Sequence, residues 1–334
     1  MRNSLLKSDR IKDILKPHSE FETVQVGFLI LNDFSLLAFS AAVEPLRAAN
    51  RLREKPLFSW VTTHISNASV RASNGLQVSV NSSLDALFKC RLVLICSGTA
   101  VEKYTDKATL AIVRRLERNG ITVGAICSGT YVLAKAGMLD DRRCTIHWEN
   151  IDAMREEFPH LEITNDLFEI DGTHITCSGG TAALDMMLHL ISQAHGAKLA
   201  AEISETFIHD RIRDSHDRQR IELRSRLGVS HPKLLMVVAN MEANLEEPLS
   251  QIELAEQANL STRQLERLFK KYMQLTPTRH YLNLRLARAR YLLRQTSMSI
   301  LSVALACGFI SASHFSKCYR ETYGCTPRAE REIN

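Results

Sequence analysis

Residues 124–139 read GAICSGTYVLAKAGML, and this stretch decides the fold of the first part of the chain. A short apolar run ends at Cys127, and Ser128 and Gly129 then open a segment with helical spacing. Glycines at 124 and 129 permit tight backbone geometry, so the pattern predicts a sharp turn from a strand into a helix beginning near Thr130. The N-terminus of that helix would favour a thiolate at Cys127. Two alternatives stay open: Cys127 is a nucleophile at this turn, or a small side chain packed in it.

Apolar runs rich in Val and Ile recur on both sides of this turn. They lie at 24–31, 58–65, 91–98, 120–127 and 174–180, and the segments between them with helical spacing include 35–53, 105–119 and 180–195. The alternation predicts a flavodoxin-like α/β fold, in which helices cover both faces of a parallel sheet. Ligands bind such sheets at the carboxyl ends of the strands. Three of these ends, 32–34, 97–99 and 127–129, are therefore expected to meet in one crevice.

Positive charge is concentrated in the last third of the chain. The net charge of the 334 residues is +5, and residues 231–334 hold 14 Lys and Arg against 9 Asp and Glu, so the preceding part is balanced. This favours an anionic partner for the last third, with nucleic acid before a membrane surface. No run of about 18 apolar residues and no signal peptide is found, which predicts a cytoplasmic protein that does not enter a membrane. The eight cysteines contain no C-x-x-C pair, so we expect reduced thiols, no metal and no cofactor.

The last third contains an internal repeat with a period of 50 residues. LAEQANLSTRQLERLFKKYMQLTP (254–277) aligns without a gap to ALACGFISASHFSKCYRETYGCTP (304–327). In this register Ala258 meets Gly308, Leu260 meets Ile310, and a Thr-Pro pair closes each copy. Small, apolar and basic positions coincide, which indicates two copies of one structural unit.

Each copy has the pattern of a helix-turn-helix. In the first, a capping box from Ser250 to Glu253 opens a helix over 250–258, and Ser261 caps a second helix. The buried face of that second helix is predicted to hold Leu265, Leu268, Phe269 and Tyr272. The second copy predicts helices over 299–307 and from about 311, with Phe315 and Tyr319 buried. One long helix over 276–296 is expected to join the copies, which could then enter successive segments of one major groove.

The elbow region resembles the class I glutamine amidotransferase-like superfamily, in the branch of the intracellular cysteine peptidase-like proteins. The resemblance is carried by AICSGTYVLAKAGMLDDRRCTIHWE (125–149) and extends over about 24–195. It implies that Cys127 and His147 occupy the positions of a catalytic pair. Several members also place a carboxylate on the first loop, where this chain has Ala38, and Glu44 lies nearly two turns further on. That departure favours a catalytic remnant, which would bind a ligand without turning it over.

Residues 233–331 resemble the DNA-binding domain of the AraC/XylS family, through LAEQANLSTRQLERLFKK and ACGFISASHFSKCYRETYGCTPRAER. By position in this motif, the residues expected to bind DNA bases are Arg263, Glu266 and Arg267 in the first copy and Ser313, His314 and Lys317 in the second. Contacts to phosphates are expected from Lys270, Lys271 and Arg320.

The combination of the two regions resembles bacterial regulators of quaternary-amine and amino-acid catabolism, for which glycine betaine, carnitine and arginine are typical inducers. It implies a ligand-responsive regulator that binds promoter DNA, activates transcription with RNA polymerase and is not an enzyme. The predicted parts are a flexible tail (1–22), a sensor domain (23–196), a charged linker (197–230) and a DNA-binding domain (231–331).

The expected ligand site contains Phe34, Gly98, Thr99, Cys127, Ser128, His147 and Trp148. Apolar stripes on helices over 180–195 and 197–213 suggest a homodimer interface. The alternative function is a hydrolase, amidase or glyoxalase that keeps the Cys127–His147 pair and is tethered to DNA.

Overall fold

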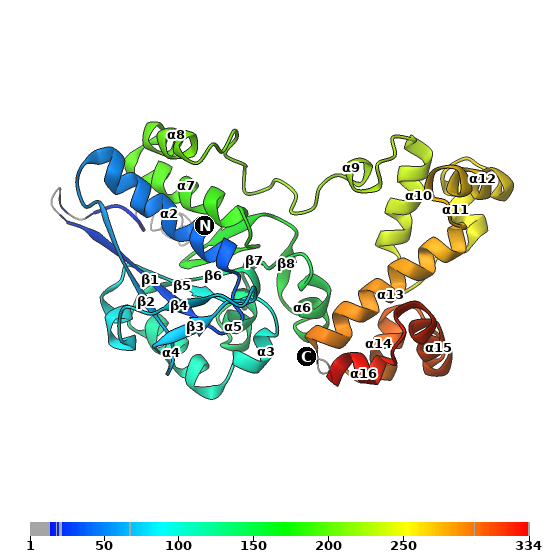
Figure 1. The fold of residues 1–334 in the computed structure, drawn as a ribbon, viewed down its shortest axis with the longest axis horizontal. Helices are drawn as coiled ribbons and strands as arrows, with labels where there is room; N and C mark the ends of the chain where they lie inside the picture. Colours follow the sequence, from blue (N-terminus) through cyan, green and yellow to red (C-terminus); the bar gives the residue numbers. More distant parts are fainter. Residues whose placement is uncertain (1–13, 18, 20–21, 67, 297, 333–334) are drawn as a thin grey trace. The chain divides into compact units, whose positions relative to one another are not determined.

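The computed structural model describes residues 14–17, 19, 22–66, 68–296 and 298–332. The chain forms two compact units, with the boundary between Gln219 and Arg220. Unit 1 holds every strand, and unit 2 is entirely helical in its described residues (Figure 1).

Unit 1 alternates strands and helices, as the sequence predicts. In chain order its elements are β1 (Val24–Ile30), α2 (Leu36–Arg53), β2 (Phe58–Thr63), β3 (Ser69–Arg71), β4 (Gln77–Ser79), η1 (Leu84–Lys89), β5 (Leu92–Cys96), α3 (Val101–Tyr104), α4 (Lys107–Arg118), β6 (Thr122–Ile126), η2 (Cys127–Gly129), α5 (Thr130–Lys135), β7 (Arg143–Thr145), α6 (Ile151–Glu157), β8 (Glu162–Thr164), β9 (Phe168–Asp171), β10 (His174–Cys177), α7 (Ala182–His195) and α8 (Ala197–Thr206).

The central sheet has the strand order β2-β1-β5-β6-β10-β9. Its first five strands are parallel, and β9 pairs with β10 in the antiparallel direction. Counted along the chain, the five parallel strands follow the order 2-1-3-4-5 of flavodoxin-like folds. The predicted fold class is therefore confirmed, and the carboxyl ends of β1, β5 and β6 lie next to one another.

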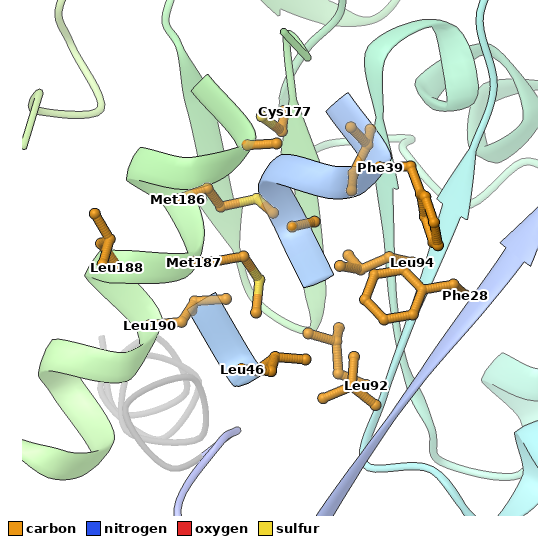
Figure 2. Close-up of a cluster of buried hydrophobic side chains, with 14 of the residues drawn as sticks. Phe28, Phe39, Leu46, Leu92, Leu94, Cys177, Met186, Met187, Leu188 and Leu190 are labelled. Carbon is orange, nitrogen blue, oxygen red and sulfur yellow. The ribbon is translucent and has the colours of Figure 1, made fainter. Parts of the chain in front are cut away.

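The strands bury side chains on both faces of the sheet, which explains their continuous apolar runs. On one face, Phe28 of β1 and Leu94 of β5 pack with Met186 and Met187 of α7 (Figure 2). The neighbouring strand residues point to the other face of the sheet. There Leu29 of β1 and Val93 of β5 belong to a second buried cluster, which includes residues of α4 and α5.

Part of the N-terminal segment that the sequence predicts to be a flexible tail is packed on unit 1. Most of residues 1–22 lie outside the described part of the chain. Ile14 and Leu15, however, are buried in the core of unit 1, and the carbonyl oxygen of Lys16 accepts a hydrogen bond of 3.0 Å from Arg91. Burial of two large aliphatic side chains fixes this part of the segment.

The predicted linker 197–230 is not one segment in the structure. Residues 197–219 belong to unit 1 and residues 220–230 to unit 2. The expected helix over 197–213 ends at Thr206, and α8 packs on α2 and α7 through Leu199 and Ile203. Several charges of the predicted charged linker are paired within one unit, for example Arg213 with Asp185 and Arg226 with Glu242.

The apolar stripes of α7 and α8 do not form the dimer surface that the sequence suggests. Met186, Met187 and Leu188 of α7 and Ile203 of α8 have no exposed surface, because they pack within unit 1. These stripes are core, and an interface between two copies would need another surface.

Unit 2 contains short helices and one long one. They are α9 (Leu223–Leu227), α10 (Pro232–Ala243), α11 (Gln251–Gln257), α12 (Thr262–Met273), α13 (Pro277–Gln295), α14 (Ile300–Ala306), α15 (Ala312–Tyr323) and α16 (Pro327–Glu332). The predicted helix-turn-helix pairs are α11 with α12 and α14 with α15, and α13 joins them (Figure 1). Both capping boxes of the first pair, at Ser250 and Ser261, are present.

The repeat is confirmed, but its alignment needs a gap. The second helices are offset by 50 residues, whereas α11 and α14 are offset by 49. The amides of Leu260 and Phe309 make equivalent hydrogen bonds, to Ala255 and Ala304, so Leu260 matches Phe309 and not Ile310. Ile310 is an extra turn residue and is 97% exposed.

The buried face of α12 is narrower than predicted. Leu265 and Phe269 are fully buried and Leu268 is half-buried, but Tyr272 is 38% exposed. The ring of Tyr272 lies 5.6 Å from the ring of His231 instead of entering the core. In the second pair, Phe315 and Tyr319 are fully buried, as predicted.

Candidate functional site

The turn at Cys127 has the strained geometry that the sequence predicts. Cys127 follows β6 directly and has a φ of 61°, a value that is uncommon for a residue other than glycine. A Cβ on Gly129 would lie 2.4 Å from the carbonyl oxygen of Ile95, and one on Gly179 would lie 2.7 Å from the Cβ of Cys127. Backbone from β5 and from the end of β10 therefore closes around the turn.

The carboxyl ends of the three strands meet, as expected. Phe34 and Gly98 form an isolated β-bridge, and the amide of Thr99 donates to the carbonyl oxygen of Asp33 at 3.1 Å. The hydroxyl of Ser128 donates to the carbonyl oxygen of Gly98. We use the name elbow cluster for the residues at these three strand ends, 32–34, 97–99 and 127–129, together with residues 145–149 and Gly179.

The Cys127 side chain is a thiol rather than the thiolate that the sequence favoured. Burial raises the pKa of Cys127 to about 11; the backbone amide of Ser128 lowers it in part, and the charge of Glu149 raises it further. The side chain is 9% exposed. Desolvation of the charged form thus outweighs the stabilisation expected from the following helix.

His147 is directed to Glu149 and not to Cys127. Its Nδ1 lies 3.7 Å from a carboxylate oxygen of Glu149 and accepts the amide of the same residue at 3.4 Å. Burial lowers the pKa of His147, and the charge of Glu149 opposes this only in part, so the ring is neutral near pH 7. Among the described residues, no hydrogen bond joins His147 to the Cys127 thiol.

The position at which the resemblance leads us to expect a carboxylate is apolar here. Ala38 is buried near the start of α2, and Glu44 forms an exposed ion pair of 2.6 Å with Arg47. The carboxylate whose charge reaches Cys127 belongs to Glu149, which our sequence analysis quoted in the motif HWE but did not select.

Two predicted ligand-binding residues are parts of the packed core. Phe34 has no exposed surface, and its ring packs edge-on against Phe39 with centroids 5.7 Å apart. Ser128 has no exposed surface either, and its hydroxyl is occupied by Gly98. Thr99 is exposed, and Gly98, His147 and Trp148 are half-buried. The accessible part of the predicted site is therefore smaller than expected.

The second helices of the two pairs, α12 and α15, are the expected recognition helices and carry exposed polar residues in matching places. All of the predicted DNA-binding side chains are exposed: Arg263, Glu266, Arg267, Lys270, Lys271, Ser313, His314, Lys317 and Arg320. Glu266 accepts a hydrogen bond of 2.9 Å from the side chain of Gln251. Within the described part of the chain, Arg263, Arg267, Lys317 and Arg320 have no ion-pair partner, which leaves their charges available to phosphates and bases.

The arginines of α13 serve a different purpose, which our sequence analysis did not identify. Arg285 donates to the carbonyl oxygens of Cys307 and Gly308 at 2.7 and 2.6 Å, at the end of α14. Arg290 and Arg294 bind the carboxylate of Glu330, which has no exposed surface. The long helix thus holds the second helix-turn-helix in place.

Neither a membrane span nor a metal site is evident in the described residues. No helix there combines the length and apolar character needed to cross a membrane. No group of three or more His, Cys, Asp or Glu side chains in the same residues is placed to hold a metal ion.

Comparison with known proteins assigns a family to each part of the chain. Residues 24–193 match the DJ-1/PfpI family, and residues 254–333 match a helix-turn-helix domain. The HTH-type transcriptional regulator GbdR of Pseudomonas aeruginosa is 48% identical over 307 residues, which cover 92% of this chain and 84% of the relative. The regulator CdhR of the same species is 47% identical over 306 residues, or 92% of this chain and 91% of the relative.

A solved structure supports the fold of unit 1. A THiJ/PfpI family protein from Pseudomonas syringae superposes with a TM-score of 0.50 and 18% identity, over 67% of this chain and 87% of that protein. At this identity the likeness concerns the fold alone.

Proposed function

The chain belongs to the DJ-1/PfpI family and, with GbdR and CdhR, to the HTH-type transcriptional regulators, and from this premise we propose that unit 1 is a sensor that controls DNA binding by unit 2. We propose further that the inducer is a quaternary amine or an amino acid, such as glycine betaine, carnitine or arginine, and that the protein activates catabolic genes.

The observation that carries this proposal is the chemistry of the elbow cluster. Cys127 is a thiol, His147 is neutral, and no hydrogen bond between them is present in the described structure. A neutral imidazole can accept a proton, but without a hydrogen bond to the Cys127 thiol it is not placed to activate the sulfur as a nucleophile. The cluster is therefore suited to reversible binding, which is what a sensor needs.

The charges of the cluster favour a cationic ligand group. Glu149 contributes a carboxylate whose charge reaches Cys127, beside the neutral side chains of Cys127 and His147. The ring of Trp148 lies 5.8 Å from that of His147 and is half-buried. An aromatic face beside a carboxylate attracts a quaternary ammonium group through cation–π and charge interactions.

Thermal unfolding of the full chain with candidate inducers tests this proposal. We expect glycine betaine, carnitine or arginine to raise the midpoint of unit 1, because a ligand that binds only the folded state stabilises it. Trp148→Phe should weaken the effect, whereas Trp60→Phe, in β2, should not. If none of these compounds nor choline changes the midpoint, the proposed class of inducer is wrong.

Selection of DNA from a random pool tests the role of unit 2. We expect enriched sequences in which two short motifs lie roughly one helical turn, about 34 Å, apart, because two recognition helices are joined in one unit. Enrichment without any recurring motif would contradict sequence-specific binding. Homodimer formation, contact with RNA polymerase and a cytoplasmic location complete the proposal.

A further inference from the structure

Residues 207–219, which we call the strap, connect α8 to unit 2 and are fixed along unit 1. The amide of Leu167 donates to the carbonyl oxygen of Ser215 at 2.8 Å. His216 Nδ1 lies 2.6 Å from a carboxylate oxygen of Asp166. These contacts hold the middle of the strap against the segment before β9.

The first part of the strap is tied to the start of α7. The guanidinium of Arg213 donates to one carboxylate oxygen of Asp185 at 2.9 and 2.6 Å, and the Arg213 amide donates to the other at 2.8 Å. The same guanidinium donates to the hydroxyl of Thr181 at 2.7 Å. Asp185 has no exposed surface, and a buried carboxylate needs such complete pairing.

The end of the strap is tied to the loop that carries His147 and Trp148. The side-chain amide nitrogen of Gln219 lies 2.9 Å from the hydroxyl of Thr145, 3.0 Å from the carbonyl oxygen of Ile146 and 2.9 Å from that of Asp166. Its side-chain oxygen is buried and accepts no hydrogen bond from a described residue. The contact thus depends on Gln219 as a donor.

Both attachments touch segments that adjoin Cys127. Thr181 comes two residues after Gly179, whose backbone lies against Cys127. The carbonyl oxygen of Thr145 accepts a hydrogen bond of 2.8 Å from Thr130, the first residue of α5. A movement of the elbow or of the His147–Trp148 loop therefore changes the acceptors that hold the strap.

We propose that Gln219 is a positioning residue for the His147–Trp148 loop, and that the strap is part of the sensor site and not a passive linker. Gln219 is the last residue of unit 1, and the chain enters unit 2 at Arg220. Displacement of the loop by an inducer would weaken or strengthen the hydrogen bonds that Gln219 donates to it. The signal then passes along the chain itself. The role of an inducer rests on the proposed function, but the hydrogen bonds between the strap and the loop do not.

Two single-tryptophan backgrounds of the full chain test this inference. The chain has two tryptophans, Trp60 in β2 and Trp148 beside the Gln219 acceptors. In a Trp60→Phe background, emission and acrylamide quenching report on Trp148. In a Trp148→Phe background they report on Trp60, in the strand at the opposite edge of the sheet from β9.

Gln219→Glu and Gln219→Met keep the approximate size of the side chain and remove its donor. We expect both to red-shift the emission of Trp148 and to increase its quenching, while Trp60 is unchanged. The matched control is Arg211→Ala, because this guanidinium binds Asp217 of the strap itself, at 2.8 Å. Unchanged Trp148 emission in Gln219→Glu would overturn the proposal. Equal changes at both tryptophans would do so as well, because they would show a general loss of structure.

Glycine betaine is the probe that separates this inference from the proposed function. If it raises the melting temperature of the wild type, Gln219→Glu should lose most of that rise and Arg211→Ala should keep it. Full retention of the rise in Gln219→Glu would contradict the role of the strap in the site. If the wild type does not respond, glycine betaine is not its inducer, while the tryptophan result still decides the position of the loop.

Discussion

The backbone of Cys127 has the strained, positive φ often found at reactive residues, but its buried side chain is a protonated thiol. A positive φ costs a non-glycine residue about 1–3 kcal/mol, so it persists only where the surroundings impose it. The burial that keeps the thiol protonated also keeps it from solvent. This combination does not favour nucleophilic attack by Cys127.

The pH dependence of thiol labelling tests the state of Cys127. Because its pKa is raised to about 11, we expect alkylation by iodoacetamide to be very slow at pH 7 and to rise roughly tenfold per pH unit up to about pH 11. Mass spectrometry of the peptide that contains Cys127 separates this site from the other seven cysteines. Saturated labelling at pH 7 would indicate a thiolate and would restore the enzymatic alternative.

The two glycines after β10 provide a matched pair for testing the packing of the elbow. In Gly179→Ala the new Cβ would lie 2.7 Å from the Cβ of Cys127, whereas in Gly180→Ala it would meet nothing within 4 Å. Both residues have a positive φ, so both variants bear conformational strain. We expect Gly179→Ala to lower the free energy of unfolding of unit 1 by about 1–3 kcal/mol more than Gly180→Ala does. Urea unfolding followed by tryptophan fluorescence measures both, and equal losses would mean that the close contact is absent.

At the scale of elements, the basic residues of unit 2 divide into two groups. Arg263 on α12 and Lys317 on α15 are exposed without ion-pair partners in the described structure, whereas Arg290 and Arg294 on α13 are committed to Glu330. The sequence shows only that the region is basic. Pairing with a buried carboxylate is what separates residues that hold the fold from residues that can bind DNA.

Substitution of one residue in each recognition helix tests this division. We expect Arg263→Ala and Lys317→Ala each to weaken binding to the selected DNA by about 1–3 kcal/mol at fixed salt. Arg328→Ala is the control, because Arg328 lies on α16 and pairs with Glu332 at 3.5 Å. Gel-shift titrations at two salt concentrations measure the change. Affinities equal to that of the control variant would show that α12 and α15 are not the recognition helices.

Regular elements could be predicted from the sequence, and the places where they end could not. Continuous apolar runs locate β1, β5 and β6, and apolar positions with helical spacing locate the helix pairs, because burial acts along the whole of such an element. The turn of the second pair is one residue longer because it contains Ile310. This residue is nearly fully exposed, so burial does not constrain it and the apolar pattern does not reveal that it is an insertion. For the same reason the turn at Cys127 could be predicted but not the orientation of His147, which a hydrogen bond and one carboxylate decide.

At the scale of the whole molecule, two units of different construction share one chain. Twelve residues, 220–231, lie between the boundary and α10, so the charged segment that suggested a single linker is divided between the units. Composition cannot reveal this division. In the sequence, an arginine that pairs with a buried carboxylate, as Arg213 does with Asp185, looks the same as an arginine that faces solvent. The tryptophans provide a simple means of following the units separately, since both lie in unit 1.

The buried carboxylate of Glu330 makes the stability of unit 2 depend on pH in a way that unit 1 need not share. Burial alone would raise the pKa of Glu330, but hydrogen bonds from Arg290 and Arg294 outweigh it and lower the pKa to about 2. A carboxyl group whose pKa is lower in the folded state stabilises the fold above its unfolded pKa of about 4.3. That stabilisation is lost as the pH falls from there towards 2.

We therefore expect Glu330→Gln to lower the free energy of unfolding of unit 2 by about 2 kcal/mol at pH 7, and by progressively less as the pH falls below 4. Glu332→Gln, on the same helix and with a side chain 70% exposed, should have little effect.

Urea unfolding followed by circular dichroism at 222 nm reports on the helices of both units, while tryptophan fluorescence follows unit 1 alone. A shift of the fluorescence transition in Glu330→Gln would show that the units unfold together. An unchanged dichroism transition would show that the Arg290–Glu330–Arg294 cluster does not stabilise unit 2. A shift confined to the dichroism transition is the expected result, because every partner of Glu330 lies in unit 2.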